Sequence, residues 1–272
     1  MRALARRYPV LVFAGLTLAY SWTLWGLMIA SARGWLPFPF ATSWTGSFGP
    51  AFGAVVTAAL LDGRRGIDGL LRPAGRWRFG RGWWLFVTLG SLVPFLAALA
   101  AWIGLHGRAG GAGEVVGKLP LLFVFYPIVL VLGGPLGEEI GWRGFALPVL
   151  LRRHSPLVAS VLVAALWALW HLPLFWLEGA AQKGSSILLF AAVVLVSSLA
   201  FTWVYRGTRG SLLSVILLHT GINVPALLVG EEKAAFAEST LFDAVQLGLW
   251  LALVLVVLAL GRREWLRKPG TP

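Results

Sequence analysis

The sequence predicts an all-α, polytopic membrane protein, and two properties of the chain support that prediction. Of its 272 residues, 58% are hydrophobic and only 12% are charged, whereas a soluble domain is about 45–50% apolar and about 25% charged. Uncharged apolar stretches of roughly 18 residues or more recur along the chain, and each is long enough for a membrane-spanning helix. We expect one transmembrane domain over residues 1–272.

Eight apolar stretches are separated by shorter polar segments, and each is expected to form one spanning helix. They cover about 9–30, 44–61, 83–104, 120–137, 156–177, 185–205, 211–229 and 242–261. The first is too long for the apolar core of a signal peptide. The second is rich in glycine and alanine, which suits close helix packing in lipid. The third opens with Trp83 and Trp84, residues that favour the membrane interface.

The basic residues lie between the apolar stretches and predict the orientation of the chain. With eight spans, 18 of the 23 Lys and Arg residues fall on one side of the membrane, and the positive-inside rule makes that side cytoplasmic. Both termini are then cytoplasmic, and the excess of Arg over Lys suggests a bacterial inner membrane. Because the net charge of +12 is confined to these segments, the expected partner is the lipid surface rather than nucleic acid.

Two adjacent acids, Glu138 and Glu139, close the fourth apolar stretch. Charge inside a bilayer is costly, so ionisable residues there are functional candidates by default. Arg143 follows Glu139 by four residues and can pair with it on one helix face, while Glu138 points about 100° away around the helix and is left available as a base. The alternative is a solvated charged cluster at a wet helix end.

Two histidines fall inside later apolar stretches, in Trp167-Ala-Leu-Trp-His171 and in His219-Thr-Gly-Ile-Asn223. In each segment the first and last residues are four apart and share a helix face. The alternatives are a packed histidine bonded to a carbonyl group for His171, and hydrogen bonding between helices for His219 and Asn223.

Together, a carboxylate, two imidazoles and a carboxamide are the parts of a hydrolytic site. The carboxylate and an imidazole can take a proton from water, while an imidazole and Asn223 can donate hydrogen bonds to an oxyanion. Glu138, His171 and His219 are equally suited as three ligands of a catalytic zinc, although no HExxH motif favours a metal. The absence of cysteine excludes a thiolate nucleophile or ligand. A transporter using the same residues as a proton relay is the second reading, but no matched pair of broken helices supports it.

These three segments resemble the EExxxR, FxxxH and HxxxN motifs of the CPBP family. That family comprises the type II CAAX prenyl endopeptidases and the bacteriocin-processing or bacteriocin-immunity membrane proteins, also called Abi proteins. The motif-bearing core covers about 120–229, and the order and internal spacing of the motifs agree with the family. One departure is Trp167, which stands where the family has phenylalanine and which we expect to change packing more than chemistry.

The resemblance implies an intramembrane endopeptidase, of a family called metalloproteases by convention, with a peptide or protein substrate at the membrane. Glu138 and His171 would activate the attacking water, His219 and Asn223 would stabilise the oxyanion, and Glu139, Arg143 and Trp167 would support the site. The resemblance does not establish a cofactor, although a divalent metal such as zinc is one option. A non-catalytic scaffold or immunity protein is the remaining alternative.

The site is expected among the fourth, fifth and seventh spans. Gly133-Gly134-Pro135, Pro173 and Pro225 lie next to the three motifs, so each of these helices is expected to break beside a reactive residue.

Overall fold

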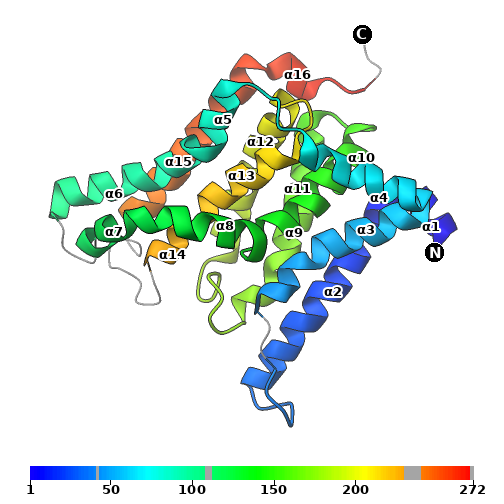
Figure 1. The fold of residues 1–272 in the computed structure, drawn as a ribbon, viewed down its shortest axis with the longest axis horizontal. Coiled ribbons are helices and arrows are strands. Elements are labelled where there is room, and N and C mark those ends of the chain that lie inside the picture. The colour runs from blue at the N-terminus through cyan, green and yellow to red at the C-terminus, as the bar shows by residue number, and fades with distance from the viewer. Residues whose placement is uncertain (41–42, 108–111, 230–239, 270–272) are drawn as a thin grey trace.

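In the computed structural model the chain is a bundle of helices (Figure 1), which confirms the all-α prediction. The structure describes residues 1–40, 43–107, 112–229 and 240–269, and no strand occurs within these ranges.

Six helical stretches are long and apolar enough to cross a membrane. They are Pro9–Ala32 (α2), Trp44–Asp62 (η1, Ser43–Phe48, with α3, Gly49–Asp62), Arg81–His106 (α5, Arg81–Thr88, η3, Gly90–Leu92, and α6, Val93–His106), Gly113–Leu132 (α7, Ala112–Lys118, η4, Leu119–Leu121, and α8, Leu122–Leu132), Pro156–Phe175 (α11, Pro156–His171, with η6, Leu172–Phe175) and Ile187–Gly207 (α12). Two further apolar helices, Leu212–Asn223 (α13) and Ala244–Leu260 within α15 (Thr240–Leu260), are shorter. The predicted count of eight spans is therefore not confirmed.

The fourth apolar stretch ends earlier than predicted. Its helix α8 stops at Leu132 because the chain turns at Gly134, whose φ of 100° is a conformation that glycine adopts without steric cost. A new helical stretch then runs from Pro135 to Leu151 as α9 (Pro135–Glu139), the π-helix η5 (Ile140–Ala146) and α10 (Leu147–Leu151). We call this stretch the acidic helix. Glu138 and Glu139 therefore do not end the fourth span but begin the helix that follows it.

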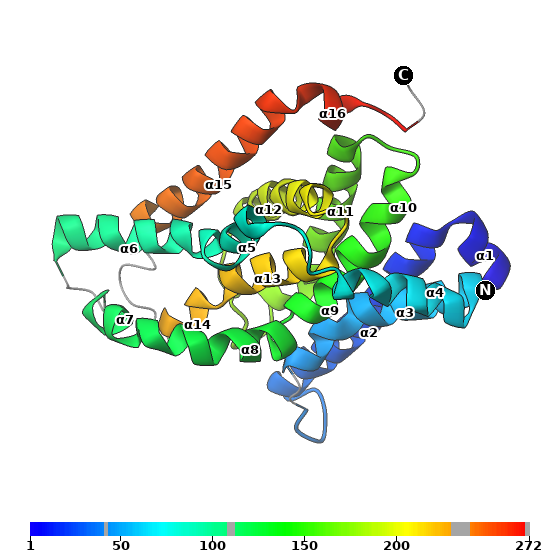
Figure 2. The same cartoon turned by 45° about the horizontal axis from the view of Figure 1, so that its top comes forward.

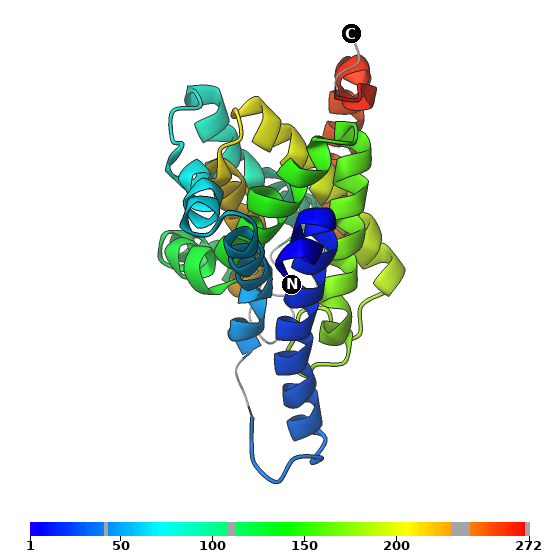
Figure 3. The same cartoon turned by 90° about the vertical axis from the view of Figure 1, so that its right-hand side faces the viewer.

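The acidic helix approaches η1 and α3 closely because its contact face carries glycine. A Cβ atom added to Gly141 would lie 2.4 Å from Cβ of Pro50, and one added to Gly137 would lie 2.8 Å from the carbonyl oxygen of Ser47. Helices α2 and α3 run side by side (Figure 3) and repeat this pattern at Gly53, whose Cβ would lie 2.4 Å from Oγ1 of Thr17. Small residues thus bring backbones together, as predicted for the second apolar stretch.

The helix α13 runs through the middle of the bundle, between α8 and α12 (Figure 2). Nearly all of its residues are buried, so a polar side chain on it faces protein rather than lipid. The acidic helix lies beside it, and Trp167 of α11 reaches it through a ring contact with His219; these three elements supply the polar residues of the candidate site.

The basic segments between helices come together on one side of the bundle, along the upper and right-hand edges of Figure 1. Nη1 of Arg76 donates a hydrogen bond of 2.9 Å to the carbonyl oxygen of Arg209. Arg206 lies 4.0 Å from Glu264 of α16 (Arg262–Leu266). The N-terminal helix α1 (Arg2–Arg7) and the turn after α10 line one cavity.

Candidate functional site

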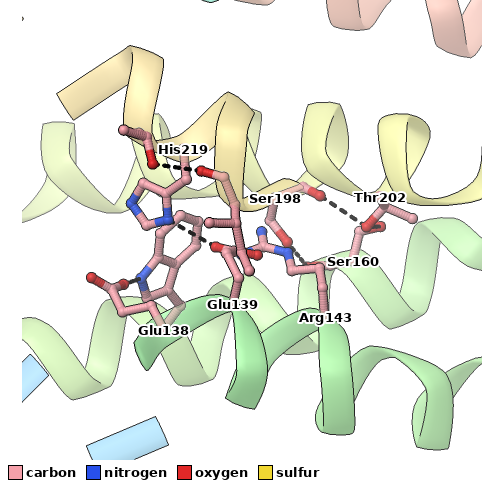
Figure 4. A network of polar contacts seen from close by, with 10 residues as sticks. Glu138, Glu139, Arg143, Ser160, Ser198, Thr202 and His219 are labelled. Atoms are coloured by element: carbon pink, nitrogen blue, oxygen red, sulfur yellow. Dashed lines mark hydrogen bonds and ion pairs between the residues drawn. The ribbon is translucent and has the colours of Figure 1, made fainter. Parts of the chain in front are cut away.

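The predicted pairing of Glu139 with Arg143 is confirmed. Nη1 of Arg143 lies 2.9 Å from Oε1 and 3.2 Å from Oε2 of Glu139 (Figure 4), and both side chains are 0% exposed. The alternative of a solvated charged cluster is excluded, because an ion pair without water contact is held by protein partners on every side. Such a pair is stable only when its remaining polar atoms are compensated.

Two aromatic rings supply part of this compensation. Cζ of Arg143 lies 4.6 Å from the ring centroid of Trp167 on α11 and 4.5 Å from that of Phe201 on α12. Nε and Nη2 of Arg143 have no hydrogen-bond partner among the described residues, so the ring faces provide the attraction that an oxygen would otherwise provide. The guanidinium group thereby joins the acidic helix to α11 and α12.

His219 completes a three-residue chain of charge-assisted contacts. Its Nδ1 lies 2.8 Å from Oε1 of Glu139, the same oxygen that accepts from Arg143. The imidazole packs edge-on against Trp167 and Phe201, at centroid distances of 5.5 and 5.4 Å. Glu139 therefore fixes the orientation of His219 through a hydrogen bond between the acidic helix and α13.

Glu138 turns away from that pair, as its position on the helix predicts. The indole Nε1–H of Trp167 donates a hydrogen bond of 2.6 Å to Oε2 of Glu138 (Figure 4), and the glutamate is only 5% exposed. We expected Trp167 to affect packing more than chemistry. That expectation is wrong, because phenylalanine has no N–H group and cannot make this hydrogen bond.

The second oxygen of Glu138 lies beside the break at Gly134. A Cβ atom on Gly134 would stand 2.6 Å from Oε1 of Glu138. The absence of a side chain at this glycine therefore keeps the space next to the carboxylate open, in addition to allowing the turn between α8 and the acidic helix.

His171 ends α11 with one ring nitrogen occupied. Its Nδ1 lies 2.8 Å from the carbonyl oxygen of Trp167. Because a carbonyl oxygen only accepts, Nδ1 must carry the hydrogen, and Nε2 of the neutral ring is left with a free lone pair. His171 is 8% exposed and interacts electrostatically with both Glu138 and His219. The structure thus brings both predicted histidines to the predicted carboxylates.

The expected helix breaks are present next to all three motifs. The acidic helix starts after the turn at Gly134, Pro173 lies in the 3-10 turn that follows His171, and Pro225 starts the short helix α14 (Pro225–Val229). Asn223 is the last residue of α13, one turn beyond His219, and is half-buried. The site is therefore built where three helices end or change direction.

The sequence also allowed a metal site formed by Glu138, His171 and His219. Within the ranges that the structure describes, no three His, Asp or Glu side chains are grouped so that they could hold a metal ion. Nδ1 of His219 is directed to Glu139 and one oxygen of Glu138 to Trp167, so only Nε2 of that ring and the other oxygen of Glu138 could face an ion. No chemical step is therefore assigned to a metal.

Sequence reasoning missed Phe201, and it did not identify the hydrogen bond from Trp167 to Glu138. Phe201 lies on α12, which carries none of the motifs, and its contact with Arg143 depends on helix packing. Hydrogen bonds among Ser160, Ser198 and Thr202 fix that packing between α11 and α12 (Figure 4). Oγ of Ser160 donates a hydrogen bond of 2.8 Å to Oγ1 of Thr202, and Oγ of Ser198 donates one of 2.8 Å to the carbonyl oxygen of Ser160. Small hydroxyl residues in both apolar stretches were the available sequence indication of this contact.

Comparison with known proteins agrees with the motifs. Residues 120–225 match the family model for the type II CAAX prenyl endopeptidase Rce1-like proteins. The chain is 27% identical over 168 residues to CAAX prenyl protease 2 of Methanococcus maripaludis, a match that covers 60% of this chain and 57% of that protein. The resemblance inferred from the three motifs is thus confirmed for the segment that carries the site, and the transporter reading is not favoured.

Proposed function

We propose that this protein is an intramembrane endopeptidase that hydrolyses a peptide bond with water activated by Glu138 and His171. The observation that supports the proposal is the placement of a buried carboxylate, held by Trp167 through one oxygen, near an imidazole whose Nε2 is free. Both groups can accept a proton, and both are shielded from bulk water.

The reaction begins when a water molecule attacks the peptide carbonyl carbon. Oε1 of Glu138 takes the proton of that water, with Nε2 of His171 as the second acceptor that orients it. The proton then passes to the amide nitrogen of the substrate as the carbon–nitrogen bond breaks, and the products are a carboxylate and an amine. Trp167 keeps Oε2 occupied, so that only one oxygen of Glu138 faces the reaction.

His219 and Asn223 are proposed to stabilise the oxyanion. Glu138, Glu139 and Arg143 together have a net charge of −1, and a doubly protonated His219 makes the group neutral. That form donates Nδ1–H to Glu139 and presents Nε2–H to the substrate oxygen. One turn along α13, the Asn223 amide supplies a second donor. Loss of a single donor of this kind typically lowers kcat by about 10²–10³-fold.

The cationic side of the bundle is proposed to face the cytoplasm of a bacterial inner membrane, with both termini on that side. Contacts of Arg206 with Glu264 and of Arg76 with the backbone of Arg209 hold basic segments together, and the positive-inside rule gives their orientation. A reporter active only in the cytoplasm, fused after residue 272, is expected to be active; an inactive reporter with active periplasmic fusions refutes the orientation.

The proposed reaction is tested with purified protein in liposomes. Because the relative is named a CAAX prenyl protease, the first substrate is a fluorogenic CAAX-type peptide with an isoprenylated cysteine, and the control substrate is the same peptide without the lipid. Glu138→Gln is expected to abolish cleavage while leaving the unfolding temperature close to that of the parent, since the amide still accepts from Trp167. A general base contributes about 10²–10⁴-fold.

The control variant is Glu139→Gln, which removes the partner of Arg143 and is expected to lower stability as well as activity. The assignment is refuted if Glu138→Gln turns over at nearly the parent rate while Glu139→Gln is stably folded and inactive. Capture of a natural substrate by Glu138→Gln in native membranes then identifies the peptide sequence that the site accepts.

A further inference from the structure

A basic cavity lies away from the candidate site, where α1 meets the turn after the acidic helix. Four guanidinium groups line it, two from Arg6 and Arg7 and two from Arg152 and Arg153, in a volume of about 390 Å³. The carboxylate of Asp62 also lines it, so cationic groups outnumber anionic groups by four to one. All four arginines are exposed, and none makes an ion pair with an acidic residue among the described parts of the chain.

Tertiary structure holds these arginines together. The side chain of Ala5 on α1 is 0% exposed, which anchors the short helix against the body of the protein and fixes where Arg6 and Arg7 project. Arg152 and Arg153 follow the last residue of α10 directly, so their place is set by the acidic helix. Four like charges gathered in this way repel one another, and an anionic ligand would relieve that repulsion.

An apolar groove adjoins the basic cavity. It has a volume of about 370 Å³ and is lined by α1 and the first turns of α2, and it shares Tyr8 and Leu11 with the basic cavity. Leu11 is 67% exposed, and a Cβ atom on Gly15 of the groove would meet no atom within 4 Å. The groove therefore runs along an apolar helix directly from the cationic cluster.

We infer that these two cavities form one binding site for an anionic phospholipid. The phosphate would lie between the two arginine pairs, and an acyl chain would follow the groove past Leu11 and Gly15. A cationic pocket between membrane helices is suited to an anionic headgroup. A free phosphate ion would occupy the basic cavity alone and leave the apolar groove empty. Because Arg152 and Arg153 directly follow the acidic helix, a bound lipid would brace the element that carries Glu138 and Glu139.

The site is tested by native mass spectrometry of the full-length protein, delipidated in detergent and titrated with phosphatidylglycerol or phosphatidylcholine. The parent is expected to retain one phosphatidylglycerol in preference to phosphatidylcholine. Arg152→Gln/Arg153→Gln is expected to weaken that binding by about 30-fold, from about fivefold per arginine near a lipid surface. Arg64→Gln/Arg65→Gln removes two exposed arginines from the same side but outside the cavity, and is expected to change binding less than threefold.

A second variant distinguishes binding of a phospholipid from binding of a free phosphate ion. Gly15→Leu keeps every charge and fills the groove, and is expected to reduce phosphatidylglycerol binding by tenfold or more. Inorganic phosphate at millimolar concentration is expected to leave bound lipid in place. In parallel, phosphatidylglycerol should raise the unfolding temperature of the parent but not of either cavity variant, which keeps the test valid if a variant is less stable.

The inference is overturned if both cavity variants bind phosphatidylglycerol as tightly as the parent, or if Arg64→Gln/Arg65→Gln weakens binding as much as the cavity substitution does. Displacement by inorganic phosphate alone would show an anion site without an acyl-chain groove and would also overturn it. None of these measurements depends on peptidase activity, so the outcome is independent of the proposed reaction.

Discussion

Replacing Arg143 by leucine is expected to destabilise the protein strongly, because it leaves a buried carboxylate without its cation. The pair is 0% exposed on both sides, with a contact of 2.9 Å. Removing one partner of a buried ion pair typically costs about 3–5 kcal/mol. At about 2–4 °C per kcal/mol for a chain of this size, the unfolding temperature should fall by roughly 6–20 °C.

The assay is thermal unfolding in detergent, followed by circular dichroism, with a double-mutant cycle. Glu139→Gln/Arg143→Leu replaces the charged pair by two neutral side chains, and the amide oxygen of the glutamine still accepts from His219. The double variant should therefore lose less stability than the sum of the two single variants, by about 1–3 kcal/mol. Additive losses within about 0.5 kcal/mol would refute the reasoning that the two charges stabilise each other.

A matched control is available in Arg206, which lies 4.0 Å from Glu264 with both side chains partly exposed. Surface pairs of this kind contribute about 0–1 kcal/mol. Arg206→Leu should therefore lower the unfolding temperature by only a few degrees. A loss equal to that of Arg143→Leu would show that burial is not the source of the difference.

Three further substitutions follow from the site geometry. Trp167→Phe keeps an aromatic ring but removes the donor to Glu138, and loss of that hydrogen bond is expected to cost about 1.5–3 kcal/mol of stability, as for other hydrogen bonds to charged groups. An unchanged unfolding midpoint, measured beside Trp167→Phe in a Glu138→Gln background, would contradict that contact. Gly134→Ala should reduce peptide cleavage at least tenfold, because the methyl group would meet Oε1 of Glu138 and the φ of 100° disfavours alanine. Gly26→Ala, where a Cβ atom would meet no atom within 4 Å, is its control in the same activity assay. Gly141→Ala should cost about 1–3 kcal/mol through overpacking against Pro50, and equal unfolding temperatures for Gly141→Ala and the parent would show that α3 shifts freely.

The sequence by itself determined the fold class, because long uncharged stretches have no favourable alternative to helices in lipid. It also identified the Glu139–Arg143 pair, since residues four apart on a helix meet whatever the rest of the chain does. The breaks at Gly134, Pro173 and Pro225 were predictable for the same reason: the local backbone chemistry of glycine and proline acts without help from tertiary contacts.

Only the tertiary structure decided which groups occupy the two glutamates. Glu139 binds His219, which is 80 residues away, and Glu138 binds the indole of Trp167, which is 29 residues away. Neither contact can be predicted from a regular spacing in the sequence, because each depends on how α11 and α13 pack against the acidic helix. The same packing placed Phe201 against Arg143, since a buried guanidinium requires partners that a single helix cannot provide.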